Sequence, residues 1–97
     1  MIAGFDERGT EDIWAGDDTK AARKVLPKKL WPRAVELLDQ LDAAVTAADL
    51  RLPKSNRLHR LKEDLKDFWS VSVNMQYRII FRFKDGQATE VGIVDYH

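Results

Sequence analysis

The first half of the chain carries apolar residues at helical spacing. The residues in this pattern are Leu30, Ala34, Leu37, Leu38, Leu41, Ala44 and Val45. Because proline fits only in the first turn of a helix, the pattern predicts a helix from about Pro32 to about Ala48. Further upstream, Thr10 is predicted to cap a short helix over residues 11–15 that ends at Gly16.

The second half alternates apolar and polar residues, as strands do. Strands are predicted over residues 68–73, 77–83 and 89–96, with a shorter one over 58–62 and a loop over 53–56. Residues 74–76 and 85–86 have the length of hairpin turns. Residues 2–5 are expected to add a strand at the edge or in the centre of the sheet. The pattern predicts an α+β fold of two layers, with N-terminal helices packed on a mainly antiparallel sheet.

One face of this predicted sheet is polar. Arg78 and Arg82 share a face of their strand, and alternation gives Ser70 and Ser72 the same face on the neighbouring strand. Two guanidiniums on a rigid surface suit the binding of phosphate. A solvated sheet face is the commoner explanation, and the pattern alone favours it.

The composition excludes several classes of protein. A chain of 97 residues has room for one domain, so residues 1–97 are expected to form a single domain. It has no cysteine, which excludes disulfides, zinc fingers, iron–sulfur clusters and thiol nucleophiles. No apolar stretch is long enough to cross a bilayer, and no membrane partner is expected. The first residues include acids where a signal peptide has bases, so the expected location is the cytoplasm.

The charges balance but are unevenly distributed. There are 16 basic and 16 acidic residues, and the formal net charge is zero. A protein that binds nucleic acid over its whole surface usually carries a basic excess. Here residues 23–34 and residues 51–62 each hold five basic residues and no acid. Such blocks are able to form a local basic patch on a neutral protein.

The two histidines, His59 and His97, are the candidates for proton transfer, because imidazole titrates near neutral pH. A lone histidine is more often a surface or packing residue. Cutting RNA without a metal needs a base for the 2′-hydroxyl, an acid for the leaving 5′-oxygen and cations for the phosphate. The residues are compatible with this chemistry. No metal-ligand spacing, glycine-rich phosphate loop or nucleophile elbow is present, so neither a metal nor a cofactor is expected.

The order of several motifs carries a family resemblance. These are the stretches at residues 56–62, 68–74, 76–83 and 85–88, and the terminal Asp95-Tyr96-His97. Together with residues 1–5, Thr10-Glu11, residues 38–44, Asp49-Leu50 and Pro53, they closely resemble HigB-type toxins of the RelE superfamily, the toxin halves of bacterial type II toxin–antitoxin modules. The resemblance covers nearly the whole chain.

The resemblance implies a compact α+β fold with a curved sheet. It also implies an endoribonuclease, an mRNA interferase that enters the A site of the 70S ribosome and cuts messenger RNA during translation. The expected partner is a helix-turn-helix antitoxin of the HigA kind. Operator DNA is expected to be bound only through the complex of toxin and antitoxin.

The resemblance also implies roles for single residues. His59 and His97 are expected to move protons, Asp95 to orient an imidazole, Tyr96 to position the substrate and Arg78 to contact the scissile phosphate. The sequence does not distinguish which histidine is the acid and which the base. The residues expected to bind RNA phosphates are Lys62, Arg57, Arg60 and Arg82.

The chain departs from the family pattern after Lys62. Such toxins commonly have Lys-Gly-Asp-Arg and then a glycine before the aromatic strand, whereas residues 62–67 read Lys-Glu-Asp-Leu-Lys-Asp. A remodelled turn and a weaker contact with RNA are expected. Two other functions are compatible with the sequence: a RelE-like fold that binds RNA or a partner without cutting, and a plain structural domain. The two histidines, Tyr96 and Arg78 favour cutting.

Overall fold

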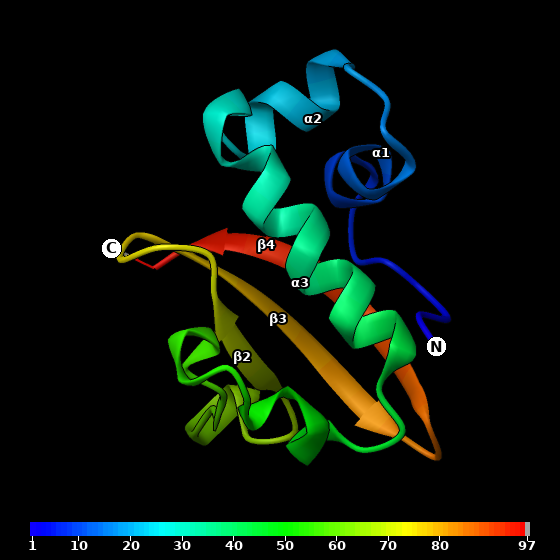
Figure 1. Cartoon of the computed structure of the whole chain (residues 1–97), viewed down its shortest axis with the longest axis vertical. Helices are drawn as coiled ribbons and strands as arrows, with labels where there is room; N and C mark the ends of the chain where they lie inside the picture. Colours follow the sequence, from blue (N-terminus) through cyan, green and yellow to red (C-terminus); the bar gives the residue numbers. More distant parts are fainter. Residues whose placement is uncertain (97) are drawn as a thin grey trace.

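Helices precede a sheet in the computed structural model, which describes residues 1–96 (Figure 1). The helices are α1 (Arg8–Ala15), α2 (Lys20–Val25) and α3 (Trp31–Ala43). The strands of the described residues are β1 (His59–Arg60), β2 (Trp69–Ser72), β3 (Tyr77–Lys84) and β4 (Gln87–Asp95). Neighbouring strands pair antiparallel in the order β1-β2-β3-β4. The prediction of an α+β fold with an antiparallel meander is therefore confirmed.

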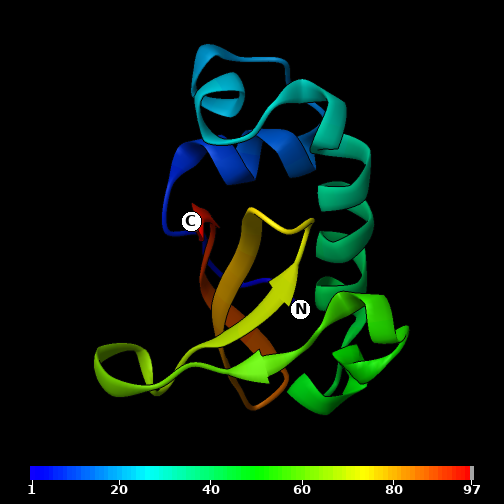
Figure 2. The same ribbon diagram turned by 90° about the vertical axis from the view of Figure 1, so that its left-hand side faces the viewer.

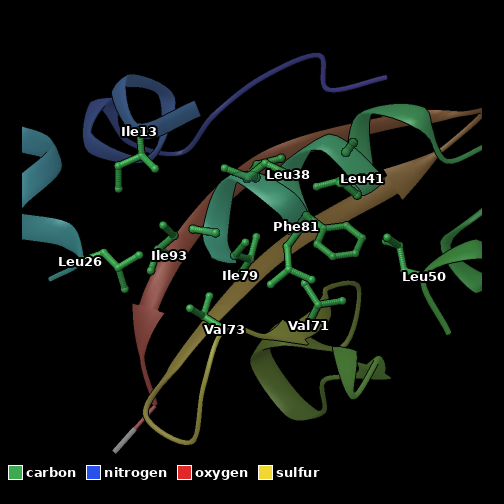
Figure 3. Close-up of a cluster of buried hydrophobic side chains, with 14 of the residues drawn as sticks. Ile13, Leu26, Leu38, Leu41, Leu50, Val71, Val73, Ile79, Phe81 and Ile93 are labelled. Carbon is green, nitrogen blue, oxygen red and sulfur yellow. The ribbon is translucent and has the colours of Figure 1, made fainter. Parts of the chain in front are cut away.

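The two layers are visible from the side. In Figure 2, α3 lies against one face of the curved sheet, and α1 and α2 lie together at one end of it. The core between the layers holds Leu38 and Leu41 from α3, which lie over Ile79 and Phe81 of β3 (Figure 3). These four side chains are buried, as the helical spacing and the strand alternation predict.

The segment before α1 runs beside β4. Ile2 and Phe5 form isolated parallel bridges to Ala88 and Val91. Backbone hydrogen bonds run in both directions, among them 2.7 Å from the Ala3 N–H to the Ala88 carbonyl and 3.1 Å from the Val91 N–H to the Gly4 carbonyl. Of the two positions expected for residues 2–5, the structure therefore has the edge, although as bridges rather than a regular strand.

Helix α1 begins three residues earlier than predicted. Its N-cap is Glu7, whose carboxylate accepts the Thr10 N–H at 3.2 Å. Thr10 was the expected cap, but it lies inside the helix, and its hydroxyl accepts the Ile93 N–H of β4 at 3.2 Å. A buried backbone donor on β4 thus determines where this threonine lies. The predicted end is correct, because Gly16 has the left-handed φ of 83° that glycine adopts readily.

Helix α3 ends at Ala43, about five residues before the predicted end. Ala44 is extended, and Thr46 then caps a 3-10 helix, η2 (Ala47–Arg51). The Asp49 carboxylate accepts the N–H groups of Val45 and Thr46 at 2.9 and 3.0 Å. This capping box starts a new helix inside a segment whose apolar spacing continues that of α3.

Candidate active site

Strand alternation separates a core face from a polar face of the sheet. Val71 and Ile79 belong to the hydrophobic core. Ser72 is paired with Arg78 in the register of β2 and β3, so both lie on the opposite face. Ser70 lies two residues from Ser72 and shares that face. The predicted juxtaposition of serines and Arg78 on one polar face is confirmed.

Arg78 connects three parts of the chain. Its Nη1 donates a hydrogen bond of 3.0 Å to the Oγ of Ser70, whose side chain is fully buried. The same nitrogen lies 3.5 Å from the Nδ1 of His59 on β1. The guanidinium carbon lies 4.8 Å from the ring centroid of Tyr96, within the range of a cation–π contact. We call His59, Ser70, Arg78 and Tyr96 the Arg78 cluster.

His59 is exposed, and its Nδ1 has two neighbours. The Arg57 carbonyl lies at 3.4 Å and Arg78 Nη1 at 3.5 Å. Nδ1 donates to the carbonyl when it carries a proton and accepts from the guanidinium when it does not. The side chain is exposed, and no hydrogen bond from Nε2 to another residue is seen within residues 1–96. A histidine in this position is able to exchange a proton with a bound molecule.

Gln76 ties the end of β4 to the cluster. Its side-chain amide donates a hydrogen bond of 3.0 Å to the Asp95 carboxylate, and its carbonyl accepts the Tyr96 N–H at 2.6 Å. Asp95 is also paired with Tyr77 in the register of β3 and β4. The sequence pattern indicated no role for Gln76, although it belongs to the turn that joins the two predicted strands. The predicted residue His97 lies outside the described residues.

The other basic residues expected at the site are distributed differently. Arg60 follows His59 in β1 and lies on the other face, where its guanidinium carbon is 5.0 Å from the Trp69 ring centroid. Lys62 is exposed and precedes the 3-10 helix η4 (Glu63–Leu65). A hollow of about 660 Å³ is lined by Arg60, Trp69 and other residues, but by none of the Arg78 cluster.

Arg82 has acidic partners. It forms ion pairs with Asp67, at 3.4 Å, and with Glu90, and its guanidinium carbon lies 4.7 Å from the Phe68 ring centroid. These contacts offset its charge and hold it away from the Arg78 cluster. Glu90 has a left-handed φ of 51° next to a register shift in the pairing of β3 and β4. Because strand alternation does not predict such irregularities, the pairing of Arg82 with Glu90 could not be expected from the sequence.

The sequence matches a family model over residues 4–97, and that family is described as RelE-like toxin of type II toxin-antitoxin system HigB. The chain belongs to the HigB-like toxin family. It is 34% identical over 88 residues to Toxin HigB-1 of Vibrio cholerae serotype O1, covering 91% of this chain and 90% of that one. It is 29% identical to Endoribonuclease HigB of Proteus vulgaris over the full length of both chains.

Solved structures of RelE-like toxins share the fold of this HigB-like toxin. A YoeB–YefM complex from Staphylococcus aureus matches with a TM-score of 0.63 and 15% identity, covering 100% of this chain and 98% of that one. YafQ from E. coli strain BL21(DE3) matches with a TM-score of 0.60 and 15% identity, covering 98% and 91%. Membership of a toxin–antitoxin family gives the chain an antitoxin as its partner. None of the helices formed by residues 1–96 has the length and apolar character needed to span a membrane.

The departure of this HigB-like toxin from the family pattern lies in the turn between β1 and β2. Glu63, which follows Lys62 where such toxins have glycine, has a left-handed φ of 58°. A residue with a Cβ is strained in that conformation, whereas glycine is not. The turn therefore has a conformation typical of glycine without having glycine. Asp67, in the same segment, supplies one of the carboxylates that pair with Arg82.

Proposed function

We propose that this HigB-like toxin is an endoribonuclease that cuts messenger RNA in the ribosomal A site by acid–base chemistry, without a metal ion. The observation that carries the proposal is the contact of Arg78 with His59, Ser70 and Tyr96. A proton-transfer group and a cation thereby lie side by side, as phosphodiester cleavage requires, and the Tyr96 ring contacts the cation. The similarity to a protein named Endoribonuclease HigB supports the same activity.

In this mechanism, the 2′-hydroxyl oxygen of one nucleotide attacks the adjacent phosphorus. A base removes the hydroxyl proton, the bond from phosphorus to the 5′-oxygen breaks, and an acid protonates that oxygen, leaving a 2′,3′-cyclic phosphate. His59 and His97 exchange these protons, in either order. Arg78 stabilises the charge on the phosphate, and Lys62 is proposed to assist it with a second positive charge.

Asp95 and Tyr96 support this chemistry from the end of β4. Asp95 orients an imidazole, and Tyr96 positions the substrate. Gln76 holds both, because its side chain binds the Asp95 carboxylate and its carbonyl binds the Tyr96 backbone. The cation–π contact between Tyr96 and Arg78 gives the ring a defined place over the guanidinium.

The neutral surface of the chain makes the ribosome important for holding the RNA substrate. A protein with no net charge binds free RNA weakly, so it depends on shape and on a few placed contacts. The A site presents messenger RNA in a fixed position, which is why we propose that cutting requires the ribosome and occurs in the cytoplasm. The partner is proposed to be a helix-turn-helix antitoxin of the HigA kind, and the complex to bind operator DNA. One of the structures with a similar fold is a YoeB–YefM toxin–antitoxin complex, which supports a protein partner for this chain.

Primer-extension mapping of messages on purified translating ribosomes tests the proposal. The wild-type chain is expected to produce a new 5′ end within the A-site codon. The same end is expected when EDTA removes transition-metal ions and excess magnesium keeps the ribosome intact. His97→Ala is expected to abolish it without changing the thermal midpoint. If the messages stay intact although the folded chain is present, the nuclease is rejected and a RelE-fold module that binds without cutting remains. Cutting of free RNA at the same rate would reject ribosome dependence.

A further inference from the structure

Another hollow, lined by basic residues, lies near the Arg78 cluster. It has a volume of about 370 Å³, and Arg33, Ser55, Arg57 and Asn74 are among its lining residues. These residues come from α3, from the 3-10 helix η3 (Lys54–Asn56) and its C-cap, and from the turn between β2 and β3. Figure 2 shows that turn, in yellow, reaching toward α3. We call this space the Arg33–Arg57 hollow.

The buried side-chain amide of Asn56 holds Arg33 in place. The Nη2 of Arg33 donates a hydrogen bond of 3.1 Å to the Oδ1 of Asn56, which is fully buried. Asn56 in turn donates to Gln40 at 2.9 Å and to the Leu50 carbonyl at 3.1 Å. The Arg33 side chain is only 24% exposed, so its guanidinium is fixed before any ligand arrives. Such preorganisation lowers the entropic cost of binding.

Among residues 1–96, one carboxylate pairs with Arg33, and it accepts one of the five guanidinium N–H groups. Glu36, whose side chain is 61% exposed, accepts a hydrogen bond from Nη1 at 2.9 Å. One N–H is donated to Glu36 and one to Asn56, and no bond of the other three N–H groups is seen within residues 1–96. An exposed carboxylate one turn away on α3 is solvated and screens the charge only in part.

Arg57 supplies the second guanidinium of the hollow, and it has no acidic partner among the described residues. Within residues 1–96 its side chain forms no ion pair or hydrogen bond, and it is exposed. Its backbone carbonyl is the one that lies 3.4 Å from His59 Nδ1. Arg57 therefore both lines the hollow and contacts the His59 ring of the Arg78 cluster. In contrast, Arg82 at the other end of β3 is paired with Asp67 and Glu90.

We propose that the Arg33–Arg57 hollow binds a backbone phosphate of the RNA, next to the phosphate at the Arg78 cluster. Among residues 1–96 no carboxylate pairs with Arg57 and one pairs with Arg33, whereas two pair with Arg82, so the strand leaves the cluster on the Arg57 side. The fixed guanidinium of Arg33 and the exposed one of Arg57 both have the planar geometry that suits a phosphate, and the hydroxyl of Ser55 adds a donor. This inference rests on the proposed function, because it takes RNA to be the substrate.

Binding of an RNA that cannot be cut tests this subsite separately from catalysis. The probe is a fluorescent heptanucleotide of 2′-O-methyl RNA, and its dissociation constant is measured by anisotropy at several salt concentrations. Arg57→Asn tolerates the left-handed φ of 49° at this position, so the backbone is preserved. It is expected to weaken binding about tenfold. It should also reduce the slope of log Kd against log salt by about 0.7, the value for one lost contact to single-stranded RNA.

Lys54→Asn is the matched control. Lys54 is the first residue of η3, which Arg57 caps, and it is exposed and does not line the hollow. The substitution removes the same charge. It is expected to change the dissociation constant less than twofold. Equal losses in the two variants would show that Arg57 acts only through overall charge, and would overturn the subsite. So would a wild-type chain that does not bind the probe.

A neutral linkage in the probe locates the contact. A single methylphosphonate is moved along the oligonucleotide, and at one position it should weaken binding to the wild-type chain but not to Arg57→Asn. Arg33→Lys should weaken binding of the unmodified probe, because lysine lacks the planar pair of N–H donors, and the methylphosphonate at that position should then cost less affinity. Its thermal midpoint is measured in parallel. If the hollow binds an acidic segment of a protein partner instead, Arg57→Asn would weaken the antitoxin complex and leave the RNA affinity unchanged.

The subsite and the nuclease have distinguishable failures. A chain that cuts messages on ribosomes, but whose Arg57→Asn and Lys54→Asn variants bind RNA equally, would retain the nuclease and lose the subsite. A chain that binds the probe through Arg57 but cuts nothing would retain the subsite and lose the nuclease.

Discussion

Arg78 donates a hydrogen bond of 3.0 Å to Ser70, and this bond joins an ionic side chain on β3 to a fully buried hydroxyl on β2. The bond orients the guanidinium, so that the same Nη1 lies beside His59 and the flat face lies over the ring of Tyr96. A lysine ammonium is a point charge and has no planar fork with which to make these contacts together.

Arg78→Lys is therefore expected to lower the rate of message cleavage about 100-fold, although the charge is retained. Because Arg78 is partly exposed on the polar face, the free energy of unfolding should change little. Single-turnover cleavage on programmed ribosomes gives the rate, and denaturant unfolding gives the stability. A rate within threefold of the wild type would show that charge alone suffices at this position.

Ser70→Ala removes the hydroxyl that orients the Arg78 guanidinium but keeps the guanidinium itself. We expect kcat to fall about tenfold with a nearly constant KM, because the orientation of Arg78 matters more in the transition state than in the bound substrate. In an Arg78→Lys background the same substitution should add almost nothing, since the two residues act through one bond. Additive losses would assign Ser70 a role in packing rather than in positioning Arg78.

Glu63→Gly is expected to stabilise the fold by about 0.5–1 kcal/mol. Glycine relieves the left-handed φ of 58° at this position, and that gain exceeds the greater freedom of glycine in the unfolded chain. Asp64→Gly, one residue along in η4, serves as the control and should destabilise, because Asp64 does not have a positive φ. Urea unfolding at neutral pH measures both. A loss of stability in Glu63→Gly would show that contacts of the glutamate outweigh its strain.

The capping box at Asp49 predicts a dependence of stability on pH. Hydrogen bonds from the backbone of Thr46 and then Val45 lower the pKa of Asp49 below its ordinary value of 3.8. A lowered folded pKa stabilises the protein above pH 3.8, and this contribution is lost as the pH falls through the folded value. Asp49→Asn should thus be less stable than the wild type at pH 7, with a smaller difference at pH 3. The exposed Asp17→Asn is the comparison, and an equal loss there would reject the cap as the cause.

Periodicity predicted the parts of the fold that bury a continuous face. The helical spacing in α3 and the alternation in β2 and β3 were sufficient, since Leu38, Ile79 and Phe81 are each buried by the layer opposite. Helix α2 was missed because its six residues are too few to show a period. Its position depends on Gly9 of α1, where a Cβ would collide with Val25 and the Ala21 carbonyl. Such close approach is a tertiary property that no local pattern reveals.

The candidate site also has a part that the sequence pattern predicts and a part that depends on tertiary structure. Alternation predicted that Ser70 and Arg78 share a face, whereas the proximity of His59 and Tyr96 to Arg78 could be expected only from a family resemblance. Gln76 was missed because its role depends on the register that brings Asp95 opposite Tyr77. The pairing of Arg82 with Glu90 depends on a backbone irregularity in β4.

The bridges from Ile2 and Phe5 to β4 have a consequence for how the chain folds. Strand β4 has neighbours on both sides, β3 and the first residues of the chain, so those residues gain their hydrogen bonds only after β4 has formed. Contacts between segments more than 80 residues apart require a large loop to close and slow folding. Until that step, β4 is an open edge of nine residues, and a second unfolded chain is able to pair with it.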